Sequence, residues 1–237
     1  MSDSIVIIPT YDEIENIEAM IRKVLSYEKE YHILIVDDNS PDGTAQKVKE
    51  LQKEFPTVLH LLERPGKKGL GTAYKAGFDW CLKQDYSFIF EMDADFSHNP
   101  DDLIHLYNAC KKENVHLAIG SRYCKAGKIK NWPMIRVLMS YYASIYVRMI
   151  LWIGIKDTTA GFKCYSRKSL ETVQYNNIPF KGYAFQICMK YAVRKHGLGI
   201  EEVPITFIDR KLGESKMSTG IFKEAFFGVW KMRKMKL

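Results

Sequence analysis

Short apolar runs alternate with helix-length segments along the chain. The first four apolar runs cover residues 4–9, 31–38, 57–64 and 86–95. Each precedes a segment with apolar residues at helical spacing, at residues 13–26, 41–55, 69–84 and 99–113. Two more strand-like runs follow, at residues 116–123 and 201–210. Strands that alternate with helices predict an α/β fold with a parallel sheet and right-handed crossovers.

Polar residues gather where the predicted strands end. The clusters are Pro9 to Glu13, Asp37 with Asp38, Asp93 to Asp95, and Ser121 with Arg122. In open sheets of this kind, ligands bind outside the carboxyl ends of the strands. The clusters therefore predict a binding site along that edge of the sheet.

Asp93 and Asp95 carry the strongest chemical signal. Alternate residues of an extended backbone point the same way, so the two carboxylates are expected side by side. Two like charges at that spacing repel each other unless a cation lies between them. Hard divalent ions such as Mg²⁺ or Mn²⁺ take oxygen ligands and share their coordination shell with substrate phosphates. We predict that Asp93 and Asp95 bind such an ion.

The acids that follow the second apolar run have two interpretations. Asp42 is expected to cap the next helix, because a carboxylate accepts hydrogen bonds from free amides at a helix start. A cap explains at most one of the adjacent acids Asp37 and Asp38. A turn or a ligand contact both remain open for that pair.

The glycine-rich stretch GKKGLGTAYKAG, residues 66–77, does not match a nucleotide-binding loop. Tyr74 stands where a dinucleotide-binding motif needs its third glycine, and no Gly-Lys-Ser/Thr follows as a P-loop needs. We expect a loop that caps a helix, in which Gly71 lets the backbone approach a ligand.

Composition and charge narrow the expected partners and compartment. The 237 residues include five cysteines without metal or redox spacing, which indicates a reducing compartment. The chain opens without the pattern of a signal peptide, so we expect a cytoplasmic protein. The net charge of +7 and the pI near 9.0 permit nucleic acid, an anionic membrane or a phosphorylated substrate. Basic residues become more frequent towards the end of the sequence, where they alternate with aromatic residues. This pattern favours a membrane surface over nucleic acid as the partner.

Two segments are candidates for contact with a membrane surface, at about residues 132–155 and 219–237. In the first, the uncharged run from Val137 to Val147 lies between Arg136 and Arg148 and is shorter than the ~20 residues that cross a bilayer. A pair of interfacial helices and a pair of buried core helices both fit this segment. The basic aromatic tail favours the interfacial version, and hence a peripheral protein at the cytoplasmic face of a membrane.

Seven motifs give the chain a family resemblance. They are PTYDE, VDDNSPDGT, GLGTAY, MDADFSH, GSRY, DTTAGFKCY and RKLGESKMS, spread in order from Pro9 to Ser218. The chain resembles family 2 glycosyltransferases of the GT-A fold, in particular the dolichyl-phosphate (polyprenyl-phosphate) β-mannosyltransferases. The resemblance implies a single GT-A domain over residues 1–237. Its Rossmann-like mixed sheet would be flanked by helices, with amphipathic interfacial helices and no transmembrane domain.

The resemblance also implies roles for individual residues. Pro9, Tyr11, Glu13, Val36 and Asp38 would surround the donor nucleotide, and Asp93, Ala94 and Asp95 would lie at its diphosphate and the metal. Arg122, Arg210 and Lys216 would meet the phosphates, and Arg136 with Arg122 would hold the acceptor phosphate. Asp95, Arg122 and Arg136 are the expected catalytic residues. In the segment GYAFQICMKY, Ala184 and Cys188 stand where the family commonly has acids.

The implied reaction is an inverting, metal-dependent transfer of mannose from GDP-mannose to dolichyl or polyprenyl phosphate. Transfer from UDP-glucose or another UDP-sugar is the first alternative, because the spacing of PTYDE does not distinguish guanine from uracil. A non-catalytic nucleotide-sugar-binding or membrane-binding module is the second. Expected partners are the nucleotide sugar, the lipid phosphate and a membrane surface, with a small membrane-anchoring subunit or the protein's own helices as the attachment.

Overall fold

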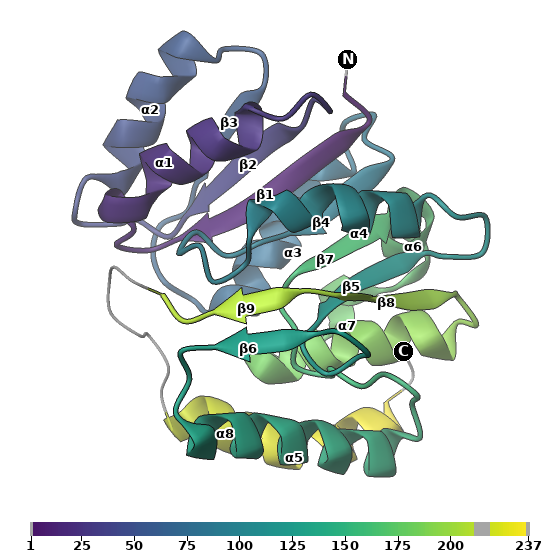
Figure 1. The fold of residues 1–237 in the computed structure, drawn as a ribbon. Coiled ribbons are helices and arrows are strands. Elements are labelled where there is room, and N and C mark those ends of the chain that lie inside the picture. The colour runs from purple at the N-terminus through teal and green to yellow at the C-terminus, as the bar shows by residue number, and fades with distance from the viewer. Residues whose placement is uncertain (1, 211–218, 236–237) are drawn as a thin grey trace.

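A mixed seven-stranded sheet forms the centre of the protein (Figure 1). The structure, a computed structural model, describes residues 2–210 and 219–235. The strands lie in the order β3-β2-β1-β4-β7-β5-β8. Their bounds are β1 (Ser4–Thr10), β2 (His32–Asp37), β3 (Leu59–Glu63), β4 (Phe88–Glu91), β5 (Leu117–Ser121), β7 (Lys163–Ser166) and β8 (Ile200–Pro204).

The sheet departs from the parallel arrangement that the sequence pattern predicts. β7 pairs antiparallel with both β4 and β5, whereas the other neighbouring strands pair in parallel. The apolar pattern missed β7 because the strand is only four residues long and begins with Lys163. The mixed sheet that the family resemblance implied is confirmed.

Helices cover both faces of the sheet. Their bounds are α1 (Ile14–Leu25), α2 (Thr44–Glu54), α3 (Leu70–Cys81), α4 (Leu103–Cys110), α5 (Met134–Leu151), α6 (Arg167–Thr172), α7 (Tyr183–Lys195) and α8 (Thr219–Lys234), with 3-10 turns η1 (Pro100–Asp102) and η2 (Tyr175–Asn177). In β1, Val6 and Ile8 pack with α1, α2 and α4, while Ile5 and Ile7 pack with α3 and α7. This alternation follows from the two-residue period of a strand that is buried on both faces.

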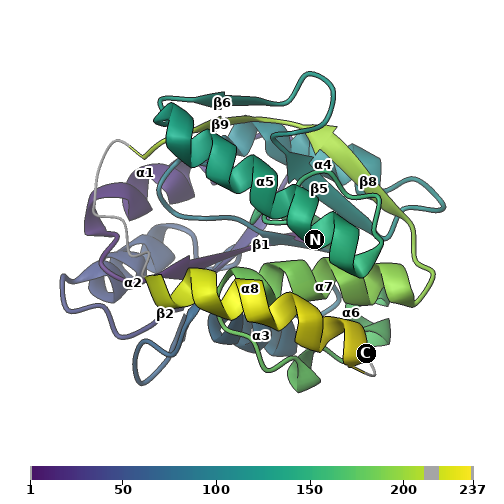
Figure 2. The same ribbon diagram turned by 90° about the horizontal axis from the view of Figure 1, so that it is seen from below.

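Helices α5 and α8 lie side by side below the sheet (Figures 1 and 2). The rings of Tyr146 and Phe226 stack at 4.9 Å, and the Tyr146 hydroxyl donates to the Phe226 carbonyl. The prediction of a helix pair within residues 132–155 is therefore wrong. That segment forms the single helix α5, and its partner is α8. A two-stranded ribbon of β6 (Lys128–Lys130) and β9 (Thr206–Ile208) lies above α5.

Candidate active site

A cleft of about 360 Å³ opens at the carboxyl ends of the central strands. It brings together most of the residues that the sequence analysis selected: Pro9, Tyr11, Glu13, Asp38, Asp93, Ala94, Asp95, Arg122, Arg136 and Arg210. Val36 is not among the lining residues, because its side chain is buried in the core beside α3. Lys216 lies outside the described residues.

The two acids at the end of β2 have different surroundings, so one of them fits a turn and the other a ligand contact. Asp37 is fully buried and accepts hydrogen bonds from the Thr10 hydroxyl and from the Ser40 amide, so it shapes the turn. Asp38 lines the cleft, and its Oδ1 lies 3.0 Å from Nη1 of Arg64. Burial raises the pKa of Asp38, while Arg64 opposes that shift. Asp42 accepts from the Thr44 amide at the start of α2, as predicted for a capping carboxylate, although the cap position of that helix is Gly43.

Asp93 and Asp95 follow β4 and both line the cleft. Oδ2 of Asp95 lies 2.8 Å from Nη2 of Arg210, and its Oδ1 accepts from the Ser97 amide. Burial raises the pKa of Asp93, with Asp95 adding to the shift and His98 opposing it. The chemistry of this pair fits a hard divalent cation, because both acids offer oxygen ligands. Among the described residues no group of three or more His, Cys, Asp or Glu side chains is placed to hold a metal, so phosphate oxygens would complete the shell.

His98 precedes the next helix start and positions the segment that carries Asp93. The cap of that helix is Asn99, whose side chain accepts from the Asp101 amide. His98 is buried, and its Nδ1 accepts from the backbone amide of Asp93 at 3.2 Å. Its ring stacks on Phe162 at a centroid distance of 5.1 Å. These contacts fix the backbone from which the Asp93 carboxylate projects.

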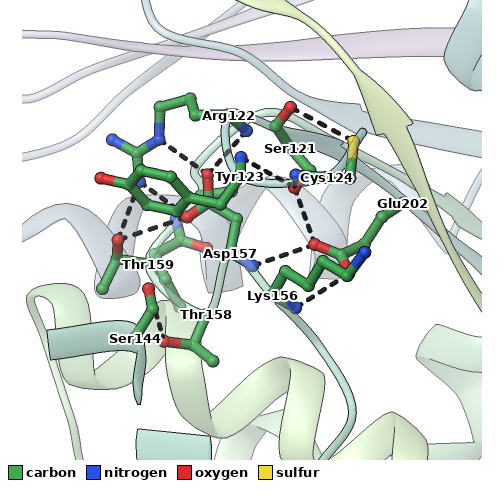
Figure 3. A network of polar contacts seen from close by, with 12 residues as sticks. Ser121, Arg122, Tyr123, Cys124, Ser144, Lys156, Asp157, Thr158, Thr159 and Glu202 are labelled. Atoms are coloured by element: carbon green, nitrogen blue, oxygen red, sulfur yellow. Dashed lines mark hydrogen bonds and ion pairs between the residues drawn. The ribbon is translucent and has the colours of Figure 1, made fainter. Parts of the chain in front are cut away.

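Arg122 is held in a buried ion pair with Asp157 (Figure 3). Its Nε and Nη2 donate to the two carboxylate oxygens, each at 2.7 Å, and Nη2 also donates to the Thr159 hydroxyl. Although burial opposes the charged form, Asp157 raises the pKa of Arg122, and Arg122 holds the pKa of Asp157 below its usual value. The guanidinium also lies 5.5 Å from the ring centroid of Trp132. Sequence reasoning missed Asp157 and Thr159, although both belong to the motif DTTAGFKCY.

Hydrogen bonds hold the segment around Asp157 from two sides (Figure 3). Glu202 accepts hydrogen bonds from the amides of Lys156 and Asp157 and from the Ser121 hydroxyl. Below it, the Thr158 hydroxyl donates to the Ser144 hydroxyl of α5. This anchoring gives Arg122 a fixed orientation at the cleft.

A second, largely apolar cavity of about 770 Å³ lies between α5 and α8 and joins the cleft. The two cavities share the residues Arg122, Trp132, Arg136, Thr159 and Tyr183. At this junction Arg136 pairs with Asp209 at 3.0 Å and lies 4.0 Å from the ring centroid of Trp132. The polar cleft therefore continues past Arg122 and Arg136 into the second cavity, which we call the apolar groove.

Comparisons with known proteins agree with this arrangement. A family model described as Glycosyl transferase family 2 matches residues 5–174. The polyprenol monophosphomannose synthase of Mycolicibacterium smegmatis is 45% identical over 232 residues, covering 97% of this chain and 87% of that protein. The undecaprenyl-phosphate mannosyltransferase of Micrococcus luteus is 44% identical over 223 residues, covering 94% and 90%.

A solved structure supports the fold. A mannosyltransferase from Pyrobaculum calidifontis in complex with GDP-Man and Mn²⁺ is similar with a TM-score of 0.61 at 14% identity, covering 97% of this chain and 69% of that one. The family resemblance seen in the motifs is thereby confirmed by both sequence and structure. The chain belongs to glycosyl transferase family 2 and has the GT-A fold.

Proposed function

We propose that the protein transfers mannose from GDP-mannose to a polyprenyl phosphate such as dolichyl phosphate, releasing GDP. The observation that carries this proposal is the junction of the two cavities, where Arg122 and Arg136 stand between a polar cleft and an apolar groove. An acceptor with a charged head and a long hydrocarbon tail matches that change of polarity. The names of the two bacterial relatives, which act on polyprenol phosphates, support the same acceptor class.

The donor fits the end of the cleft that holds the acids. Asp38, which is paired with Arg64, offers carboxylate oxygens to N–H groups of a nucleobase. Arg210 lines this part of the cleft and would meet the diphosphate, and Asp93 with Asp95 would hold Mg²⁺ or Mn²⁺ against it. When bound, this ion neutralises charge on the departing diphosphate. The mannosyltransferase of similar fold in complex with GDP-Man and Mn²⁺ supports this donor and cofactor class.

The acceptor supplies its own nucleophile. A phosphate monoester has a second pKa of about 6 and is largely a dianion at neutral pH. One of its oxygens forms the new bond to the anomeric carbon while the bond from that carbon to the GDP oxygen breaks, and GDP leaves with the electron pair. No proton needs to be removed, so a catalytic base is not required. In-line displacement inverts the anomeric centre and gives a β-linked product from an α-linked donor.

The arginines at the junction orient the reacting phosphate. Nε and Nη2 of Arg122 are occupied by Asp157, and within the described part of the chain Nη1 is left for a ligand. Arg136 is more exposed, and its partner Asp209 is about one third exposed, so a phosphate dianion would exchange with that carboxylate. Both groups hold the attacking oxygen near the sugar and shield it from water.

The lipid tail would follow the apolar groove to a membrane surface. Exposed apolar side chains lie on α5 and α8: Met134, Ile135, Leu138, Met139, Tyr141, Tyr142, Met149, Phe226, Phe227 and Trp230. The basic side chains of Lys231, Arg233 and Lys234 lie at the end of α8. This combination is typical of helices that lie in the interface of an anionic bilayer. We infer peripheral attachment at the cytoplasmic face, by these helices themselves or with a small anchoring subunit.

Helix α5 also has the length of a membrane span. Met134–Leu151 has a mean hydropathy of 1.2. Among the helices in residues 2–210 and 219–235, it alone is long and apolar enough to cross a membrane. Arg136 and Arg148 near its two ends, together with the pairing of α5 with α8, favour an interfacial position over a span.

A transfer assay tests the proposal. The purified protein is incubated with Mg²⁺ or Mn²⁺, a short polyprenyl phosphate and labelled GDP-mannose, UDP-glucose or UDP-GlcNAc. We expect lipid-linked product from GDP-mannose alone. Product from a UDP-sugar instead would overturn the donor and keep the mechanism. No product from any donor, in the presence of liposomes, would favour the non-catalytic alternative.

A further inference from the structure

A buried lysine lies beneath the segment that carries the contacts of Arg122. Lys190 is fully buried on α7. Its Nζ donates to the carbonyl oxygens of Thr158, Ala160 and Gln186, at 3.0, 2.7 and 3.3 Å. Burial lowers the pKa of Lys190. Its buried Nζ needs hydrogen-bond acceptors, and these carbonyls supply them, which ties the lysine to the path of the segment above it.

These contacts determine where the neighbouring backbone amides point. A trans peptide unit is planar, so its N–H points opposite to its carbonyl, and the described residues contain no cis peptide bonds. The carbonyls of Thr158 and Ala160 face Lys190, and the amides of Thr159 and Gly161 therefore point away from it. Thr159 and Gly161 both line the cleft, whereas Lys190 lies beneath them.

The two amides have no hydrogen-bond acceptor among the described residues. They face different ends of the cleft. Thr159 lies at the junction, lines both cavities and contacts Arg122 through its hydroxyl. Gly161 lies at the metal end, where an added Cβ would come within 3.9 Å of Oδ2 of Asp93. The Thr159 amide is thus the one beside the expected acceptor phosphate.

We propose that the backbone amide of Thr159 donates a hydrogen bond to the acceptor phosphate, and that Lys190 is the positioning residue that aims it. This inference rests on the proposed function and adds to it a donor with a fixed direction beside Arg122. Preorganised backbone amides stabilise anionic oxygens without reorganising during the reaction. Lys190 itself does not touch the substrate.

The amide is tested directly in the unaltered protein. Uniformly ¹⁵N-labelled protein is titrated with farnesyl phosphate, and in parallel with farnesol. We expect the Thr159 amide proton to move downfield with farnesyl phosphate and to stay in place with farnesol. Shifts of other junction residues without a shift of Thr159 would overturn the inference and leave the proposed function standing. No response of any residue to farnesyl phosphate would overturn the acceptor assignment, and the inference with it.

Substitution tests the role of Lys190. Lys190→Met should lower kcat/KM for farnesyl phosphate by roughly 10- to 100-fold through misplacement of the amide, with a smaller change in the KM for GDP-mannose. Lys75→Met is the matched control, because Lys75 donates to the carbonyls of Asn176 and Ile178 away from the cleft. Equal loss for donor and acceptor, or the same loss in the control, would contradict a positioning role. If Lys190→Met does not fold, the titration of the unaltered protein still decides the assignment of the amide.

Discussion

The buried pair of Arg122 and Asp157 gives the sharpest test of the site. In the pair, the side chains of Arg122 and Asp157 are only 8% and 0% exposed. The variant Asp157→Asn keeps the size of the side chain and removes its charge. It leaves the Arg122 guanidinium buried without a counter-ion, because the oxygens that now accept from Nε and Nη2 are those of Asp157.

The expected destabilisation follows from that burial. Removing one partner of a buried ion pair lowers the free energy of unfolding by about 3–5 kcal/mol. For a chain of this size each kcal/mol lowers Tm by roughly 2–4 °C, so a fall of roughly 6–20 °C is expected. Arg122→Met combined with Asp157→Asn should recover part of the loss, since Arg122→Met removes the unpaired charge.

A more exposed pair at the same junction provides the control. Arg136 and Asp209 are 37% and 30% exposed, so Asp209→Asn should lower the free energy of unfolding by at most about 1 kcal/mol. Urea unfolding followed by circular dichroism measures the wild type, the single variants Asp157→Asn, Arg122→Met and Asp209→Asn, and the double variant. Equal effects of Asp157→Asn and Asp209→Asn, or strict additivity in the double variant, would refute the reasoning.

The pH dependence of the same variant has a defined sign. Arg122 holds the pKa of Asp157 below its usual value, so the native state favours the ionised form. The stabilisation is complete above the unfolded pKa of about 4 and is lost as pH falls through the lower folded pKa. The difference in stability between the wild type and Asp157→Asn should therefore shrink in acid.

Three further predictions concern the cleft and the membrane face. Asp95→Asn should abolish transfer and metal-dependent donor binding with an unchanged circular dichroism spectrum; a fully active variant would contradict the metal assignment. Arg136→Ala should raise the KM for the polyprenyl phosphate more than the KM for GDP-mannose. Equal increases in both would argue against a role of Arg136 in acceptor binding. Phe227→Asp should weaken sedimentation with anionic liposomes, whereas Ile104→Asp, an exposed apolar position on α4, should not.

The sequence predicted the donor side of the site well because that side is built locally. Asp93 and Asp95 follow a buried strand, and parallel pairing places the ends of β1, β2 and β4 at one edge. The periodicity of the apolar residues therefore determined both the fold class and the position of the acids. The resemblance of the motifs then identified Arg122, Arg136 and Arg210, which the structure places in the same cleft.

The contacts that the sequence did not predict join residues far apart in the chain. Asp157 is 35 residues from Arg122, Asp209 is 73 residues from Arg136, and Lys190 is 32 residues from Thr158. No local pattern specifies these partners, because they depend on how β7 and α7 pack beside the parallel strands. The partner of α5 was missed for the same reason, since α8 comes from the end of the chain.

Each described arginine expected to contact phosphate is paired with an aspartate: Arg122 with Asp157, Arg136 with Asp209, and Arg210 with Asp95. The pairs differ in burial, and this difference separates their roles. The buried pair of Arg122 is too costly to break, so it serves as a fixed part of the junction. The arginines of the other two pairs are 37% and 28% exposed, and under the proposed function a phosphate would replace the carboxylate beside each. If the donor diphosphate replaced Asp95 beside Arg210, Oδ2 of Asp95 would be released. Donor binding would then make a carboxylate oxygen available to the metal.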